Sequence, residues 1–69
     1  MRVNIDRIEI EMANKALSTA EFLELAQVPR GTWYTVRRTG KTGTATVGRI
    51  ARALNVPVTE ILIKSEVTT

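Results

Sequence analysis

The sequence predicts a compact all-α fold of four to five short helices. Apolar residues recur at helical spacing in successive segments, and Pro, Gly and Asn separate these segments by short turns. The chain has 69 residues and no cysteine or histidine, so its 43% of hydrophobic residues must supply the core. We expect a single domain over residues 1–69, with its core at about residues 4–62 and a tail at residues 63–69.

The first helix begins at Asn4 or Asp6, which are both favourable N-cap residues. Its apolar positions fall on one stripe at helical spacing: Ile5, Ile8, Met12 and Ala16. Ile10 lies off this stripe, so it is either exposed or in contact with a partner.

The second helix extends from about Thr19 to Ala26. Ser18 and Glu21 form a capping-box pattern in front of it, and Leu17 is placed to pack against Phe22. Phe22, Leu23 and Ala26 are the expected inward residues.

The third helix begins near Pro29 or Arg30, because proline interrupts the second helix but fits a first helical turn. Trp33 and Val36 share one face, which we assign to the core. The opposite face carries polar and basic residues: Arg30, Gly31, Tyr34, Thr35 and Arg38. Gly40 ends the helix within a loop at residues 39–43.

A fourth helix, capped by Thr44 or Thr46, extends to about Asn55. Its expected inward residues are Val47, Ile50, Ala51 and Leu54. Arg49 and Arg52 point elsewhere and are either solvated or paired with acids of the first helix. A final helical turn at residues 59–62 follows, and Val58, Ile61 and Leu62 close the core.

Positive charge is concentrated in one third of the chain. Residues 30–52 carry +6 without any acidic residue, residues 1–29 carry −2, and residues 53–69 carry −1. A concentrated positive charge on a small domain favours a polyanionic partner, with nucleic acid as the first candidate.

Two segments together resemble a known family. The sequences are LSTAEFLELAQVPRGTWYTVRR at residues 17–38 and TVGRIARALNVPVTEIL at residues 46–62. They are similar to the helix-turn-helix and the downstream helices of phage Cro and repressor proteins, the Xre-like family. The resemblance covers about residues 6–62 and implies a lambda-repressor-like DNA-binding domain whose helices 2 and 3 form the helix-turn-helix.

The turn of this motif departs from the family pattern. Leu23 stands where a small residue is usual, Ala26 where a larger one is usual, and Gln27 where glycine is usual. Gln27 either adopts a left-handed backbone, at a cost of about 1 kcal/mol, or gives the turn a different shape.

The resemblance implies which residues contact DNA, with the third helix (about residues 30–38) in the major groove. It places four residues at base-contacting positions: Arg30, Gly31, Tyr34 and Thr35. Arg30 can give paired hydrogen bonds to guanine, and Thr35 can contact a thymine methyl or a phosphate. Tyr34 is equally compatible with a surface aromatic packed on a neighbour. Expected phosphate contacts are Thr19, Arg38, Lys41, Thr42 and Thr44.

Composition also limits the other functions. We expect no catalytic or metal site and no cofactor, because Cys and His are missing and the acids look like surface and capping residues. We expect no membrane segment, no secretory signal and no small-molecule ligand, and therefore a cytoplasmic protein.

The predicted function is a sequence-specific transcriptional regulator of phage or mobile-element repressor type that binds double-stranded DNA as a homodimer. Candidate dimer residues are Ile61, Ile63 and Val67, but the alternation over residues 61–63 also fits ordinary core, so the dimer surface stays open. The alternatives are a protein-binding helix-turn-helix, such as an antitoxin or antirepressor, and an excisionase-like accessory that bends DNA.

Overall fold

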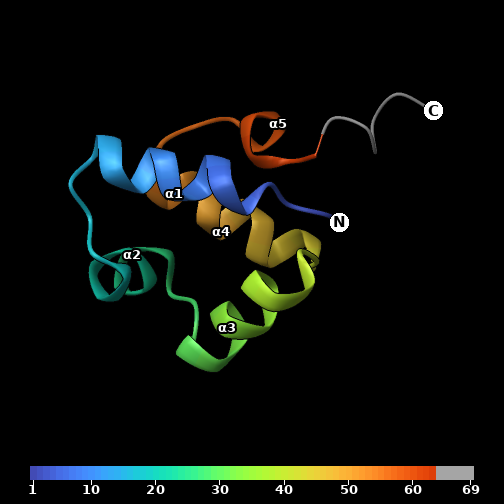
Figure 1. The fold of residues 1–69 in the computed structure, drawn as a ribbon. Helices are drawn as coiled ribbons and strands as arrows, with labels where there is room; N and C mark the ends of the chain where they lie inside the picture. The colour runs from blue at the N-terminus through green and yellow to red at the C-terminus, as the bar shows by residue number, and fades with distance from the viewer. Residues whose placement is uncertain (64–69) are drawn as a thin grey trace.

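The structure, a computed structural model, describes residues 1–63, and the elements named in this range are all helices. They are α1 (Ile5–Asn14), α2 (Thr19–Ala26), α3 (Arg30–Thr39), α4 (Thr44–Leu54) and α5 (Val58–Ile61) (Figure 1). The predicted all-α class is confirmed within these residues. None of the five helices has the length and apolar character needed to cross a bilayer.

Side-chain caps begin the first two helices as expected. The Asn4 side chain accepts the backbone N–H of Arg7 at 3.0 Å, which starts α1. Ser18 Oγ accepts the backbone N–H of Glu21 at 3.1 Å, while Glu21 Oε1 accepts the backbone N–H of Ser18 at 2.9 Å. The predicted capping box is therefore present in both directions.

Two helix boundaries were predicted wrongly. Ala16 is exposed and has a left-handed backbone (φ 54°), because α1 ends at Asn14 and the chain turns towards α2. Neither Thr44 nor Thr46 caps α4. Gly43 occupies the N-cap, and Thr44 and Thr46 are the first and third residues of the helix.

Left-handed residues end three of the helices. They are Gln27 after α2 (φ 56°), Gly40 after α3 (φ 71°) and Asn55 after α4 (φ 57°). Gln27 therefore takes the left-handed form of the turn, and its N–H bonds to the Glu24 carbonyl at 3.3 Å. Val28, directly after it, is buried and fixes the three-residue connection to α3.

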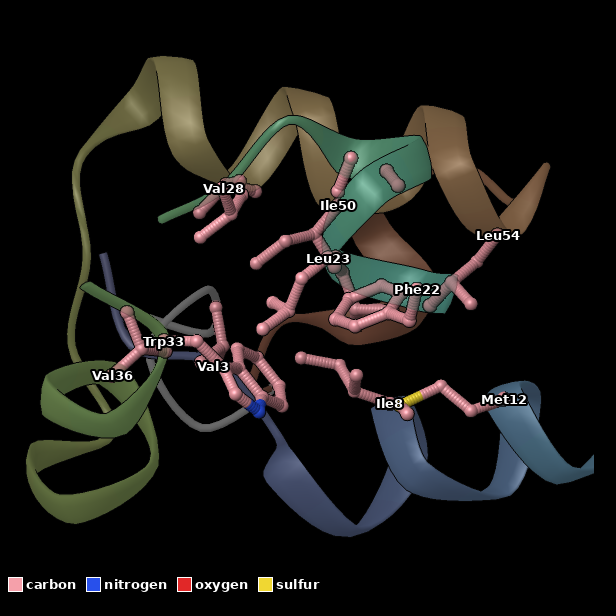
Figure 2. Packing of buried hydrophobic residues seen from close by; sticks show 14 residues of the cluster. Val3, Ile8, Met12, Phe22, Leu23, Val28, Trp33, Val36, Ile50 and Leu54 are labelled. Carbon is pink, nitrogen blue, oxygen red and sulfur yellow. The ribbon is translucent and has the colours of Figure 1, made fainter. Parts of the chain in front are cut away.

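The core gathers residues from every helix. Figure 2 shows Phe22 and Leu23 of α2, Trp33 of α3 and Ile8 and Met12 of α1 lying towards a common interior. Phe22 and Trp33 meet edge to face, with ring centroids 5.1 Å apart at 69°. The predicted assignment of Trp33 to the core is confirmed.

The N-terminal segment was missed by the sequence prediction. Val3 is 2% exposed, and its N–H donates to the Gly40 carbonyl at 2.8 Å. On the other side of the segment, the Asn4 N–H donates to the Ile61 carbonyl at 2.7 Å. Residues 1–4 thus join the α3–α4 loop to the chain after α5 through antiparallel bridges.

The helices are arranged so that α3 lies at the edge. α2 packs against α4, and α5 packs against both α1 and α4. In Figure 1, α3 runs along the side of the molecule away from α5. As a result, one side of α3 faces solvent along the whole helix.

Candidate nucleic-acid interface

The exposed surface of α3 is the strongest candidate site. Only Trp33 and Val36 of its ten residues are buried, and the other eight are exposed. Gly31, Tyr34, Thr35 and Arg38 lie on the side opposite the two buried residues, given the helical period. We call these four residues, with Arg30 at the start of the helix, the outer face of α3.

All four predicted base-contacting residues belong to this outer face. Tyr34 is 52% exposed and forms no hydrogen bond and no ring contact within residues 1–63. Apart from its chain neighbours and the backbone of α3, a Cβ added at Gly31 would meet no atom within 4 Å. The outer face is therefore free of intramolecular cover.

Two hydroxyl groups on α3 are engaged by the protein itself. Thr35 Oγ1 donates to the Gly31 carbonyl at 3.1 Å, and Thr39 Oγ1 donates to the Thr35 carbonyl at 2.8 Å. Thr39 Oγ1 also accepts the backbone N–H of Lys41 at 3.2 Å. This chain of hydrogen bonds connects the outer face to the loop that follows it.

Most of the basic residues in the +6 segment have no acidic partner. Within residues 1–63, five of them form no ion pair: Arg30, Arg38, Lys41, Arg49 and Arg52. Arg37 is the exception, because its Nη2 lies 3.0 Å from Glu9 Oε2 of α1.

One acid of α1 is paired instead with cations in or directly after its own helix. Glu11, which is buried, lies 2.9 Å from Arg7 and 3.8 Å from Lys15. Arg49 and Arg52 are thus exposed and not paired with α1, which decides between the two expectations for them. The positive field of the outer face and of α4 remains uncompensated.

The loop at residues 40–43 carries Lys41 and Thr42, two of the predicted phosphate contacts. The N-terminal segment holds one side of the loop, since the Thr42 N–H donates to the Met1 carbonyl at 2.9 Å and Val3 bonds to Gly40. Thr39 holds Lys41 from within α3. The Lys41 side chain is left exposed and unpaired within the described residues.

The two predicted helix-start contacts differ in their electrostatics. Thr44 begins α4, which has no side-chain cap and no acid in its first turn. Thr19 begins α2, where Glu21 supplies a carboxylate. The backbone hydrogen bond from Ser18, followed by that from its side chain, lowers the pKa of Glu21. Its negative charge opposes an anion near Thr19 and has no counterpart near Thr44.

One candidate for the dimer surface is wrong. Ile61 is fully buried in the core, so it cannot contact a second copy. Ile63 is half-buried, and Val67 lies outside the described residues.

No pocket is found among residues 1–63, so the candidate site is an open surface. Comparisons of the chain with protein-family models, curated proteins and solved structures find no match. The surface of α3 and its surroundings therefore carry the functional proposal.

Proposed function

We propose that this protein is a sequence-specific regulator of transcription that binds double-stranded DNA through a helix-turn-helix of Cro and repressor type, formed by α2 and α3. The observation that carries the proposal is the uncovered outer face of α3, bordered by cations that have no acidic partner within residues 1–63. An α-helix about 10–12 Å across fits a major groove about 12 Å wide.

The turn between the two helices supports this assignment. Gln27 holds the left-handed conformation that glycine adopts in the family pattern, and Val28 and Ala26 are buried beside it. With these residues in place, α2 and α3 are joined by a short connection from which α3 projects (Figure 1).

In this proposal Arg30 recognises guanine through paired hydrogen bonds, and Gly31 lets the helix approach the groove floor. Arg38 and Lys41 bind phosphates after the recognition helix, with Thr42 and Thr44 beside them. Thr44 is the stronger of the two helix-start candidates, because the carboxylate of Glu21 disfavours a phosphate at Thr19.

The test is a selection of bound sequences from a random double-stranded library, followed by binding measurements on the selected duplex. Arg30→Ala should lose preference at one base pair, by about 1–3 kcal/mol. Arg37→Ala is the matched control, since Arg37 lies on the same helix but is paired with Glu9. It should keep the preference. An Arg30→Ala protein with the selectivity of the native chain would refute the role of Arg30.

Salt dependence separates DNA binding from the protein-binding alternative. Affinity for DNA should fall steeply between about 50 and 200 mM salt, and Arg38→Ala and Lys41→Ala should each flatten the slope by about one unit. Failure to bind any duplex at low salt would refute the proposed function. Measurement of the bend angle distinguishes a repressor from an accessory that bends DNA.

A further inference from the structure

Thr35 is the residue of the outer face whose possible contacts with a ligand the structure restricts most, because its hydroxyl donor is already used within α3. Its hydroxyl proton is directed back to the Gly31 carbonyl at 3.1 Å, within the same helix. Such back-bonding is a common arrangement for threonine in helices, because it satisfies the hydroxyl without an outside partner. With its proton used in this way, the hydroxyl offers no donor to a phosphate oxygen, and the side chain presents its methyl group and the acceptor lone pairs of Oγ1 to an external ligand.

The surroundings of this methyl group are open. Thr35 is exposed, and Gly31 lies one helical turn before it and has no side chain. Apart from the chain neighbours of Gly31 and the backbone of α3, no atom lies within 4 Å of where its Cβ would stand. Residues at this spacing lie side by side on a helix surface. Gly31 and Thr35 therefore form a small site that offers a methyl group and bare backbone but no free hydroxyl donor.

We propose that Thr35, with Gly31 beside it, recognises the C5-methyl group of a thymine in the major groove, and that Thr35 does not bind phosphate. This inference rests on the proposed DNA-binding function. Among the bases, only thymine presents a methyl group in the major groove, and apolar side chains recognise it by contact. Arg30 lies five residues earlier, about 7.5 Å along the helix axis, so the thymine lies within about two base-pair steps of the guanine.

The experiment starts from the duplex selected from a random library by the native protein. Each thymine is replaced in turn by deoxyuridine, which removes the C5-methyl group and leaves base pairing unchanged. At one thymine of each recognised site, the replacement should weaken binding by about fourfold, the value for one buried methyl-sized group. The other thymines should tolerate the change.

Two variants of Thr35 then distinguish the contribution of the methyl group to binding from that of the hydroxyl. Thr35→Ser keeps the hydroxyl and removes the methyl group, so it should bind the thymine and deoxyuridine duplexes equally. Thr35→Val keeps the methyl group and removes the hydroxyl, so it should retain the preference for thymine. Thr32→Ser is the matched control, because Thr32 is an exposed threonine of α3 outside the outer face, and its preference should be that of the native chain.

The opposite pattern would overturn the inference. If Thr35→Val weakens binding to both duplexes while Thr35→Ser still prefers thymine, the hydroxyl contacts phosphate and the methyl group does not select the base. If the native protein enriches a sequence but no thymine in it is sensitive to deoxyuridine, the methyl contact is absent although the proposed function stands. If no duplex is bound at low salt, the proposed function itself fails.

Discussion

Gly31 is a glycine that the packing of the protein does not require. It lies within α3, and among glycines only Gly40 has a positive φ. A Cβ at Gly31 would enter open space. Glycine in a helix costs about 0.5–1 kcal/mol relative to alanine, and in the proposed function this cost is offset because the backbone of α3 can approach the duplex closely.

Replacement of Gly31 by alanine should therefore have opposite effects on the stability of the protein and on its affinity for DNA. We expect Gly31→Ala to raise the free energy of unfolding by up to about 1 kcal/mol, measured by urea denaturation, and to weaken binding to the selected duplex. Gly48→Ala is the control, since Gly48 also has open space around it but lies in α4. It should stabilise the protein without a change in DNA affinity. Equal DNA binding by Gly31→Ala and the native chain would contradict the close approach.

Thr39 is the link between α3 and the loop that follows it. Its hydroxyl donates to the Thr35 carbonyl and accepts the Lys41 N–H, so one side chain connects the end of the helix to the proposed phosphate-binding lysine. On the other side, the loop is held by the buried Val3 segment. The position of Lys41 thus depends on two contacts. One is the bond to Thr39, two residues earlier, and the other is the bond from the distant Val3 to the neighbouring Gly40.

We expect Thr39→Val to lower DNA affinity for all sequences alike, because Lys41 loses the bond that fixes its backbone. The free energy of unfolding should fall by only about 1 kcal/mol, since these bonds are exposed. Thr39→Ser retains the hydroxyl and should bind as the native chain does. A change in base preference, measured with single-base variants of the selected duplex, would show instead that Thr39 acts on the outer face.

The start of α2 gives a prediction on pH. Hydrogen bonds from the backbone and side chain of Ser18 lower the pKa of Glu21 in the folded protein. Its stabilising contribution is therefore present above the ordinary pKa of a glutamate and is lost as the pH falls through the lowered value. In acid titrations of stability, Glu21→Gln should remove this part of the pH dependence and keep the neutral capping bond. An identical acid response in both proteins would exclude Glu21 as the cause.

The helices could be predicted because the residues that begin, pack and end each helix lie close together in the sequence. The Ser18–Glu21 capping box, the spacing of Phe22, Leu23 and Ala26, and Gly40 at the end of α3 each act within a few residues. The wrong assignments concern places where two local signals compete, as at Gly43 and Thr44, which both suit an N-cap.

The contacts of the N-terminal segment could not be predicted in this way. Val3 pairs with Leu62, 59 residues later, and isolated bridges of this kind leave no periodic pattern in the sequence. The outer face of α3 followed from helical spacing, whereas the internal bond of the Thr35 hydroxyl became visible only in three dimensions.

Acidic and basic side chains differ in where they form ion pairs. Of the five acids in residues 1–29, Glu11 is paired with Arg7 and Lys15, and Glu9 is paired with Arg37, whereas the other three form no ion pair within residues 1–63. The unpaired cations lie on α3, the loop after it and α4. The electric field should therefore orient the molecule with α3 towards a polyanion before any specific contact forms.

The length of α3 limits what one copy can recognise. Ten helical residues extend about 15 Å, which is about four base-pair steps. If the proposed function holds, we expect tight and selective binding to involve two copies, and the selected duplex to contain two half-sites whose centres lie about 10 base pairs apart. The dimensions of one copy, 35 × 24 × 18 Å, allow two to occupy successive major grooves on one face of the duplex.

Insertion of five base pairs between the half-sites would place them on opposite faces, so the affinity should fall towards that of one half-site. Equal affinity for both duplexes would show that each copy binds alone.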